Sequence, residues 1–467
     1  MARIVIMGGG PAGYEAALVA AQHGSDVTVV ERAGMGGACV LDDCVPSKTL
    51  IASAGIRVEL HRAPELGLTG DRAAVGVDLP TVNARVRSLA LAQSADVRTR
   101  VEREGIRVIR GTATFGEAAT GRDPHVIEVT PDGGAAEVLP ADVVLVATGA
   151  TPRVLPDATP DGDRILTWRQ LYDLAELPEH LVVVGSGVTG AEFVSAYVEL
   201  GTRVTLVSSR DRVLPGEDAD AAAVLQEVFA ERGVQILAQA RAESVRRDGD
   251  GVLVTLADGR TVTGSHALMT VGSVPNTGGI GLEKVGIETD RSGFIPVDRV
   301  SRTSTPGIYA AGDCTGVLML ASVAAMQGRI AMWHALGEGV APIKLKTVAA
   351  AVFTRPEIAT VGISQRAIDA GEVPARTIML PLSTNPRAKM QGLRRGFVKL
   401  FCRPATGVVI GGVVVAPVAS ELILPIALAV QNGLTVADLA HTFSVYPSLS
   451  GSITEAGRQL MRHSDLD

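Results

Sequence analysis

The sequence is poor in cysteine, in aromatic residues and in positive charge. It has 4 Cys among 467 residues, aromatic residues make up 3%, and the formal net charge is −7. Four cysteines in a chain of this length do not make the dense disulfide framework of small secreted proteins, so we expect a cytoplasmic protein. The negative charge argues against nonspecific binding to nucleic acid and against docking on acidic membrane surfaces.

Long hydrophobic runs are also missing. No apolar run reaches the ~18 residues of a membrane-spanning helix, so we expect no membrane span. The first strand-like run begins at Ile4, which leaves no room for a signal peptide. Glycine, in contrast, is abundant, with 52 residues. Turn-rich α/β chains have this composition, and the length allows about three domains.

Two glycine-rich turns of the same design stand out. Each has the form G-x-G-x-x-G, follows a short apolar strand-like run and opens a helix-like segment. The glycines are Gly8, Gly10 and Gly13 in the first turn and Gly185, Gly187 and Gly190 in the second. In this context the three glycines permit a tight turn, close approach of the backbone to a pyrophosphate, and close packing of helix on strand. The sequence therefore predicts two dinucleotide sites, with electrons passing from one nucleotide to the other.

The residue that ends the next strand distinguishes the two sites. Glu31 lies 18 residues after the first turn, where a carboxylate accepts hydrogen bonds from ribose hydroxyls, and this favours FAD. Ser208 holds the equivalent position of the second unit, and Arg210 and Arg212 follow it. Serine and arginine donors attract a 2′-phosphate that a carboxylate would repel, so we expect NADPH, with NADH as the alternative. The other interpretation is that both arginines are solvated surface charges.

Proline and glycine clusters divide the chain into three parts. We expect an α/β fold with two Rossmann-like dinucleotide-binding domains and an α+β C-terminal domain. The FAD-binding domain is discontinuous and takes residues 1–150 and 273–345, and the NAD(P)H-binding domain takes residues 151–272. Residues 346–467 form the C-terminal domain. Helices are expected from Ser47 toward Leu60 and from Leu79 to about Glu104, and no metal site is expected.

A pair of cysteines follows the first nucleotide-binding unit, in the run Cys39-x4-Cys44-Val-Pro-Ser-Lys48. Four intervening residues can form a turn that brings two sulfur atoms within bonding distance. Cys44 lies just before the expected helix, whose N-terminus favours a thiolate. Lys48 adds a positive charge one turn further on.

Together these segments resemble the pyridine nucleotide–disulfide oxidoreductases, such as lipoamide dehydrogenase, glutathione reductase and mercuric reductase, from end to end. The matching segments are Gly8–Gly13 with Glu31, the cysteine run, Ala147-Thr148-Gly149, Gly185–Glu192, Gly312-Asp313 and the C-terminal domain. The resemblance implies FAD on the first unit, a nicotinamide on the second, and a homodimer made by the C-terminal domain.

The resemblance also implies roles for single residues. It implies that Asp313 hydrogen-bonds the ribityl chain of the flavin and that Lys48 pairs with Glu192 near flavin N5. Thr148 and Gly149 are expected to contact FAD, and Gly272, at a similar strand end, is expected to contact NAD(P)H.

The C-terminus departs from the disulfide-reducing members of the family. Those members carry H-P-T-x-S-E, in which the histidine is the acid/base for the thiols and the glutamate orients it. Here Tyr446 stands at the histidine position and Gly451 at the glutamate position. A tyrosine of pKa ~10 is a poor base at pH ~7, and loss of a positioned acid/base costs ~10²–10⁴ in rate.

Asp42 and Asp43 also replace an Asn and a Gly that are usual between the cysteines. Two carboxylates disfavour a thiolate, and glycine's positive φ is lost at Asp43. Cys39 and Cys44 are therefore either a redox-active disulfide or two reduced, buried thiols beside the flavin.

The expected function is that of an FAD-dependent NAD(P)H:quinone oxidoreductase, in which hydride passes from nicotinamide to flavin N5 and then to a quinone. The chain is most similar to an actinobacterial branch of the family, dihydrolipoamide dehydrogenase-like quinone reductases that share the run from Gly36 to Lys48 and lack the His–Glu pair. Reduction of lipoamide or a low-molecular-weight disulfide by Cys39 and Cys44 is the first alternative. A flavin-bound structural protein is the second, and the intact Gly190, Glu192 and Lys48 argue against it.

Overall fold

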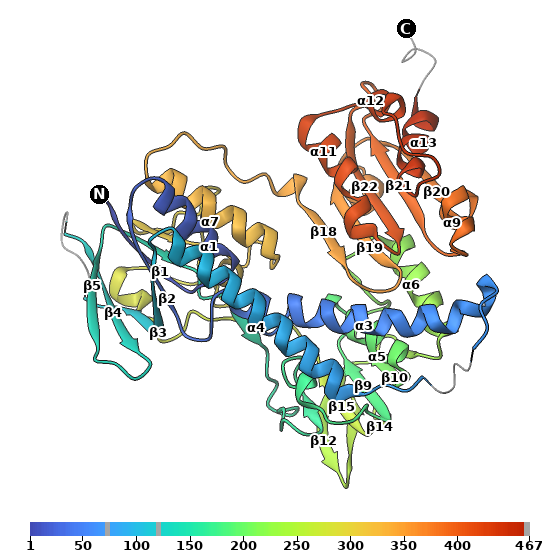
Figure 1. Ribbon diagram of the computed structural model, residues 1–467, viewed down its shortest axis with the longest axis horizontal. Coiled ribbons are helices and arrows are strands. Elements are labelled where there is room, and N and C mark those ends of the chain that lie inside the picture. Colours follow the sequence, from blue (N-terminus) through green and yellow to red (C-terminus); the bar gives the residue numbers. More distant parts are fainter. Residues whose placement is uncertain (71–74, 118–122, 462–467) are drawn as a thin grey trace.

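The computed structural model describes residues 1–70, 75–117 and 123–461. Two α/β bodies and a C-terminal α+β body are visible in Figure 1. The first sheet, with β1 to β5, lies at the left, and the second, with β9, β10 and β15, lies at the lower right. The C-terminal body, drawn in orange and red, stands above the second one. Helix α4 runs from the first body to the second, and α3 lies between the second body and the C-terminal body. The expected α/β class with an α+β C-terminal domain is confirmed.

The first body is built on a seven-stranded sheet with the order β17-β6-β1-β2-β3-β4-β5. Its strands are β1 (Arg3–Met7), β2 (Asp26–Glu31), β3 (Arg107–Phe115), β4 (His125–Pro131), β5 (Glu137–Ala141), β6 (Val143–Val146) and β17 (Ile308–Ala310). The five strands from β17 to β3 are parallel. The apolar runs of β17, β6, β1 and β2 are buried on both faces, whereas β3 alternates buried and exposed residues. Helices α1 (Pro11–Gln22) and α7 (Ala321–Ala335) pack closely. A Cβ on Gly328 of α7 would lie only 2.1 Å from the Ala12 carbonyl oxygen of α1, so glycine is needed there.

The cysteine segment forms two helices, α2 (Gly37–Leu41) and α3 (Cys44–Arg62), followed by η1 (Ala63–Leu66) and α4 (Leu79–Arg103). The helix expected from Ser47 starts three residues earlier, at Cys44. The Ser47 N–H donates to the Asp43 carbonyl at 2.8 Å, which closes a first turn over Cys44, Val45 and Pro46. Proline is tolerated there because the first turn of a helix has no partner for its N–H groups.

The second body repeats the design with a parallel five-stranded sheet, β11-β10-β9-β15-β8. Its elements are β8 (Ile165–Leu166), η2 (Gln170–Asp173), β9 (His180–Val184), α5 (Val188–Leu200), β10 (Arg203–Val207), α6 (Ala219–Glu231), β11 (Gln235–Leu237) and β15 (His266–Met269). A three-stranded antiparallel sheet of β12 (Ala242–Asp248), β13 (Gly251–Leu256) and β14 (Thr261–Gly264) is inserted before β15. The chain enters and leaves this body through an antiparallel ribbon of β7 (Ala150–Pro152) and β16 (Ser273–Pro275).

The C-terminal body is an antiparallel sheet of order β18-β19-β22-β21-β20 covered by short helices. Its strands are β18 (Ala349–Val352), β19 (Glu357–Gly362), β20 (Arg376–Pro381), β21 (Phe397–Cys402) and β22 (Val409–Ala416). Its helices are α8 (Gln365–Asp369), α9 (Pro386–Met390), α10 (Ala419–Leu422), α11 (Leu424–Asn432), α12 (Val436–His441) and α13 (Gly451–Leu460). The remaining short turns are η3 (Leu282–Val285), η4 (Asp313–Thr315), η5 (Leu345–Thr347) and η6 (Leu382–Thr384).

A buried ion pair joins the second and third bodies. The Lys399 ammonium on β21 lies 2.8 Å from the carboxylate of Asp218, which caps the N-terminus of α6, and the two side chains are 2% and 3% exposed. Within residues 1–70, 75–117 and 123–461, no helix is both long and apolar enough to span a lipid bilayer.

Candidate active site

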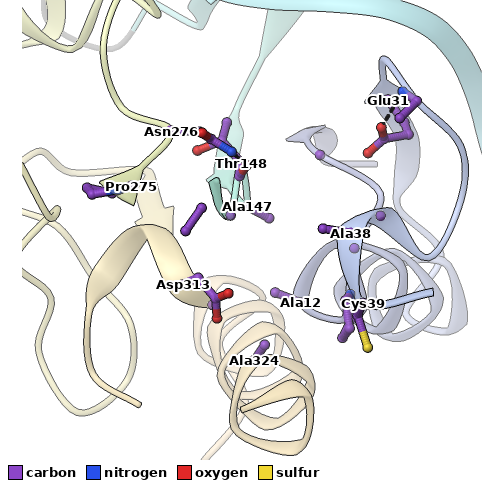
Figure 2. A pocket seen from close by; sticks show the side chains of 18 of the residues that line it. Ala12, Glu31, Ala38, Cys39, Ala147, Thr148, Pro275, Asn276, Asp313 and Ala324 are labelled. Carbon is purple, nitrogen blue, oxygen red and sulfur yellow. Dashed lines mark hydrogen bonds between the residues drawn. The ribbon is translucent and has the colours of Figure 1, made fainter. Parts of the chain in front are cut away.

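A cavity of about 480 Å³ opens at the carboxyl edge of the first sheet, where ligands bind in open α/β folds (Figure 2). It is lined by residues from the ends of β1, β2 and β6, from η4 and from both cysteine helices. Sequence-predicted residues in this lining are Gly8, Gly10, Glu31, Cys39, Cys44, Thr148, Gly149 and Asp313. The structure therefore brings together most residues that the sequence assigns to FAD and to the thiols.

The first glycine turn has the geometry of a phosphate cradle. Gly8 has φ +114°, and a Cβ there would lie 2.2 Å from the Ala147 carbonyl oxygen, so a larger residue is excluded. A Cβ on Gly13 would lie 1.9 Å from the Gly8 carbonyl oxygen, which shows how closely α1 meets the turn. A Cβ on Gly10 would meet no atom within 4 Å. Gly10 therefore faces free space at the N-terminus of α1, which fits the close approach of a pyrophosphate.

The second turn repeats this geometry at the N-terminus of α5. Gly185 has φ +116°, and its Cβ would lie 2.4 Å from the Thr270 carbonyl oxygen. The Cβ of Gly190 would lie 2.0 Å from the Gly185 carbonyl oxygen, and that of Gly187 would meet nothing within 4 Å. Gly272, with φ +90°, follows β15 at the same edge of the sheet. A second dinucleotide therefore fits here as the first does on α1.

Glu31 is held by backbone donors at the end of β2. Its Oε2 accepts from the Gly9 N–H and its Oε1 from the Ala33 N–H, both at 2.7 Å. Its Oε1 also accepts from the Gly34 N–H at 3.4 Å, and since a carboxylate offers about four acceptor positions, about one remains for another donor. Because Glu31 also lines the cavity, ribose hydroxyls can reach it, and this role stays a prediction.

The three residues expected to recognise a 2′-phosphate differ in their surroundings. Ser208 is 0% exposed, and its hydroxyl lies 2.7 Å from the Ser186 hydroxyl, so it braces the loop from within. Arg212 donates to the Pro215 carbonyl at 3.4 Å and is half-buried, whereas Arg210 is exposed. Of the three, Arg210 is the side chain best placed to meet a charged ligand, and its contact with one stays a prediction.

The two cysteines are free thiols in contact with each other. Cys39 comes from α2, and Cys44 is the first residue of α3. A hydrogen bond from the Cys39 thiol lowers the pKa of Cys44, against the effects of burial and of Asp43, and Lys48 lowers it further. The same hydrogen bond raises the pKa of Cys39, which keeps its proton as the donor. Cys44 is therefore the more acidic thiol of the pair.

Three carboxylates surround the thiols. Burial raises the pKa of Asp42, of Asp43 and of Asp313, the last to about 6. Asp42 also forms an ion pair with Arg169 at 3.2 Å. Asp43 has φ −124°, so this position does not adopt the positive φ that favours glycine.

Lys48 and Glu192 form an ion pair between the cysteine helix and the second body. The Lys48 Nζ lies 2.8 Å from Glu192 Oε2, and the Glu192 side chain is 5% exposed. Glu192 Oε1 accepts from the Phe353 N–H at 2.9 Å, and the ammonium lies 4.8 Å from the centre of the Phe353 ring. Burial lowers the pKa of Lys48, but Glu192 outweighs it and the net shift is upward. The expected pairing is confirmed, and its place beside the flavin stays a prediction.

Tyr446 and Gly451, the C-terminal residues at the positions of the family's His–Glu pair, do not lie beside the thiols of the same chain. Tyr446 is 82% exposed, and Gly451 opens α13 with its N–H bonded to the Ser448 hydroxyl at 3.1 Å. Neither lines the cavity, and among the described residues that do line it there is no histidine.

Sequence reasoning missed several residues of the site. Trp168 and Arg169 line the cavity from the second body, and Gln327 Oε1 accepts from the Gly312 N–H at 2.9 Å, next to Asp313. None of them lies in a motif, because each reaches the site through the packing of segments that are far apart in the chain.

Two family comparisons cover nearly the whole chain. Residues 2–328 match the pyridine nucleotide-disulphide oxidoreductase family, and residues 348–457 match the dimerisation domain of that family. The match spans both glycine turns, the cysteine segment and the C-terminal body.

Individual relatives agree with this assignment. An NAD(P)H dehydrogenase (quinone) of Mycobacterium tuberculosis is 67% identical over 468 residues, which cover 100% of this chain and 95% of that protein. A dihydrolipoyl dehydrogenase of Chlorobaculum tepidum is 34% identical over 458 residues, 97% of this chain and 96% of the relative.

Solved structures give the same result. The crystal structure of LpdA from Mycobacterium tuberculosis has a TM-score of 0.95 at 66% identity and covers 99% of this chain and 100% of that one. A HOCl-induced flavoprotein disulfide reductase from Escherichia coli has a TM-score of 0.86 at 25% identity, with coverage of 99% and 100%. FAD and NAD(P)H are the cofactors that this family implies, and the two glycine turns fit them. The chain belongs to the pyridine nucleotide-disulfide oxidoreductase family.

Proposed function

We propose that the chain is an FAD-dependent NAD(P)H:quinone oxidoreductase, with NADPH as the preferred donor. The observation that carries this proposal is that Tyr446 and Gly451 stand where disulfide-reducing members carry the His–Glu pair. The described residues that line the cavity of the single chain include two cysteines and four carboxylates and no histidine, and Tyr446 is 82% exposed.

FAD, when bound, supplies a two-electron acceptor that takes hydride from a nicotinamide at N5 and returns the electrons to a quinone. The glycine turns on α1 and α5 bind the two pyrophosphates. Asp313, which lines the cavity, would hold the ribityl chain. The Lys48 ammonium, fixed by Glu192 and close enough to lower the pKa of Cys44, would supply a positive charge near the reacting end of the flavin. The lowered pKa of Cys44 favours its thiolate form.

The missing imidazole separates the two classes of acceptor. A disulfide releases a thiolate that must be protonated in place, and a general acid is most effective when its pKa is near the working pH. A quinone takes two electrons through hydride transfer and gains its remaining proton on an oxygen that water can reach. The 67% identical relative carries the name NAD(P)H dehydrogenase (quinone), which supports a quinone as acceptor here.

We further propose that the working unit is a homodimer. Residues 348–457 match a dimerisation domain, and the C-terminal body exposes a cluster of apolar side chains. Phe443 is 104% exposed, Val445 78% and Tyr446 82%. Such a contiguous apolar surface is typical of a protein–protein interface.

A steady-state comparison tests the function. Purified protein with FAD is assayed with NADH and with NADPH, each against menadione and against lipoamide. We expect kcat/KM with menadione to exceed that with lipoamide by about 100-fold, the lower end of the cost of a lost acid/base. Equal turnover of the two acceptors would reject the quinone assignment, and failure of both NADH and NADPH to bleach the flavin under argon would reject the proposed hydride transfer to FAD.

Reduction of a low-molecular-weight disulfide is the second candidate. The contact between Cys39 and Cys44 favours it, because a hydrogen-bonded thiol pair with one lowered pKa is the reduced form of an exchanging disulfide. Lipoamide is the acceptor that would show this activity in the same assay.

A further inference from the structure

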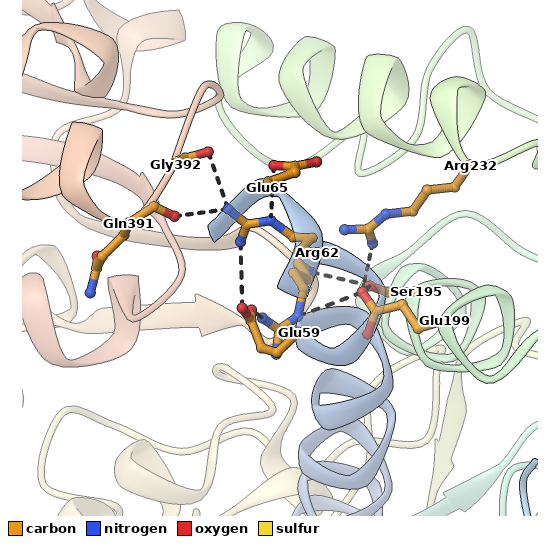
Figure 3. Close-up of polar contacts among 9 residues, drawn as sticks. Glu59, Arg62, Glu65, Ser195, Glu199, Arg232, Gln391 and Gly392 are labelled. Carbon is orange, nitrogen blue, oxygen red and sulfur yellow. Dashed lines mark hydrogen bonds and ion pairs between the residues drawn. The ribbon is translucent and has the colours of Figure 1, made fainter. Parts of the chain in front are cut away.

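A stripe of three buried polar side chains runs along α5 from the Lys48–Glu192 pair. Glu192, Ser195 and Glu199 lie one helical turn apart and are only 4%, 2% and 4% exposed. The Ser195 hydroxyl donates to Glu199 Oε1 at 3.3 Å, and the Arg232 guanidinium donates to the same oxygen at 2.6 Å (Figure 3). Only the first of these three residues is part of the site described above.

The loop between β18 and β19 lies along these three side chains and hydrogen-bonds to two of them through backbone N–H groups. The Phe353 N–H donates to Glu192 Oε1 at 2.9 Å, and the Arg355 N–H donates to the Ser195 hydroxyl at 3.1 Å. The Arg355 Nε lies 3.8 Å from Glu199 Oε1. A segment of the C-terminal body therefore holds the carboxylate of Glu192 and, two residues on, the next two turns of α5.

Arg355 also contacts the cysteine helix. Its Nη1 donates to Glu59 Oε1 at 3.0 Å, and a Cβ on Gly55 would lie 2.0 Å from its Nη2. Lys48, Gly55 and Glu59 are spaced so that they share one face of α3. Lys48 binds α5 at one end of this face, and Arg355 fills the space between α3 and α5 at the other end.

Stability alone does not account for a carboxylate at this depth. Burial raises the pKa of Glu199, and Arg232 and Arg355 lower it again, so the charged form depends on its partners. The desolvation of a buried ion pair can exceed its Coulombic gain, and an apolar contact of the same volume is often as stable. A buried network does, however, fix the relative register of the elements that it joins.

We propose that Arg355 and Glu199 are positioning residues for the Lys48–Glu192 pair, holding α3, α5 and the 353–355 loop in one register. The inference rests on the proposed function, in which Lys48 faces the flavin. Neither residue touches the reacting atoms; both act through Ser195 and Glu192. Misplacing a reacting geometry by about 1 Å can cost on the order of 100-fold in rate, so loosening this register should slow hydride transfer rather than weaken nucleotide binding.

Gly55→Ala gives the sharpest test, because it separates position from stability. Its methyl group displaces the Arg355 guanidinium, while alanine is a better helix former than glycine, so the melting temperature should not fall. Arg355→Met removes the charge, Arg355→Lys keeps it, and Glu199→Gln keeps the volume. Arg395→Met is the matched control, since Arg395 also joins the C-terminal body to the second body, through Glu227 and Glu231 on α6.

The measurement is anaerobic flavin reduction in the holoenzyme by NADPH, without any acceptor. We expect the limiting rate to fall about 10-fold in Gly55→Ala, Arg355→Met and Glu199→Gln, with the half-saturating NADPH concentration within about twofold of wild type. Arg355→Lys should restore most of the rate, and Arg395→Met should change neither value. Hydrogen exchange of the Phe353 amide, which needs no turnover, should be several-fold faster in the three slow variants only.

Several results would overturn the proposal. Equal slowing by Arg395→Met and Arg355→Met would show a general role in joining the domains. A wild-type rate and unchanged Phe353 exchange in Gly55→Ala and Arg355→Met, with FAD retained, would show that the register does not depend on Arg355. If NADPH does not reduce the wild-type flavin, the proposed function fails instead, and the exchange measurement still decides whether Arg355 holds the loop.

Discussion

The Lys48 ammonium lies 2.8 Å from the Glu192 carboxylate, although the two residues are 144 positions apart and belong to different nucleotide-binding bodies. Glu192 is 4% exposed, and its Oε1 accepts a hydrogen bond from the Phe353 N–H while Oε2 accepts from Lys48. Both oxygens of the carboxylate are therefore fixed. A carboxylate whose two oxygens are both bonded does not reorient when a ligand binds. The Lys48–Glu192 pair is therefore preorganised before any nucleotide binds.

Glu192→Gln should slow flavin reduction by NADPH about 10-fold or more. The amide keeps the size of the side chain and can still accept from the Phe353 N–H, but it no longer balances the Lys48 charge. Because Glu192 opposes the effect of burial on the pKa of Lys48, this pKa falls in the variant. The pH profile of the reduction rate, measured by stopped flow, should therefore lose activity at a lower alkaline pH than wild type. An unchanged alkaline limb would contradict the role of the pair.

Cys44→Ser should leave menadione reduction within about tenfold of wild type, because the electrons leave directly from the flavin. The same variant should lose any lipoamide reduction, since that reaction needs the thiolate. Flavin content, measured from the absorbance spectrum, is the control for folding. A larger loss of menadione turnover with FAD still bound would make the cysteines obligatory carriers.

Tyr446→His combined with Gly451→Glu should raise lipoamide reduction by about 10-fold or more, if the absent acid/base limits that reaction. Tyr446 is 82% exposed in the single chain, so the new imidazole can reach thiols only across a dimer interface. The assay therefore includes the oligomeric state of the variant. No gain in a dimeric variant would place the limitation in the turn that carries Asp42 and Asp43.

Arg210→Ala should raise KM for NADPH by about 10-fold and leave KM for NADH unchanged, because only the former has a 2′-phosphate. Arg212→Ala should have a smaller effect, since Arg212 is already bound to the Pro215 carbonyl. Steady-state kinetics with both nucleotides and menadione give the comparison. Equal changes in KM for NADH and for NADPH would show that the two arginines are surface charges that do not recognise the 2′-phosphate.

His266→Gln should make stability less dependent on pH. Burial and the nearby Arg164 lower the pKa of His266 to about 4, below its unfolded value of about 6.5. The folded state thus binds this proton less tightly, and the stability present above pH ~6.5 is lost as the pH falls toward 4, by about 2 kcal/mol between pH ~7.5 and pH ~5. Urea midpoints of wild type and variant at these two pH values test this, and an equal loss in both would contradict it.

The parts of the fold governed by short motifs were predictable from the sequence. The two glycine turns, the strands before them and the long helix ending near Glu104 are local patterns with a physical cause in a few neighbouring residues. The strand β22 was not, because Gly411 and Gly412 divide it into two apolar runs. Both glycines are nevertheless part of the strand. Its neighbours lie too close for a side chain there, since a Cβ on Gly411 would lie only 2.7 Å from the Ile363 carbonyl oxygen.

The site was predictable where family motifs reach it and unpredictable where packing builds it. The pairing of Lys48 with Glu192 followed from the resemblance. The contact of Arg169 with Asp42 and that of Arg355 with Glu199 left no signal, since each joins segments that share no motif and no regular spacing. The burial of Ser208 against Ser186 was equally invisible, because it depends on how two loops fold over the edge of a sheet.

The buried contact between Lys399 and Asp218 limits how the molecule can move. The ribbon of β7 and β16 joins the first body to the second, but any wide swing of the second body would pull α6 from β21 and separate the Lys399 ammonium from Asp218 and Asp220. Such a swing would exchange the hydrogen bonds of the Lys399 ammonium with both carboxylates for bonds to water, so we expect the opened conformer to be a minor one. We therefore expect turnover to proceed with little relative movement of the three bodies, and motion to be confined to the nicotinamide ring, the acceptor and single side chains.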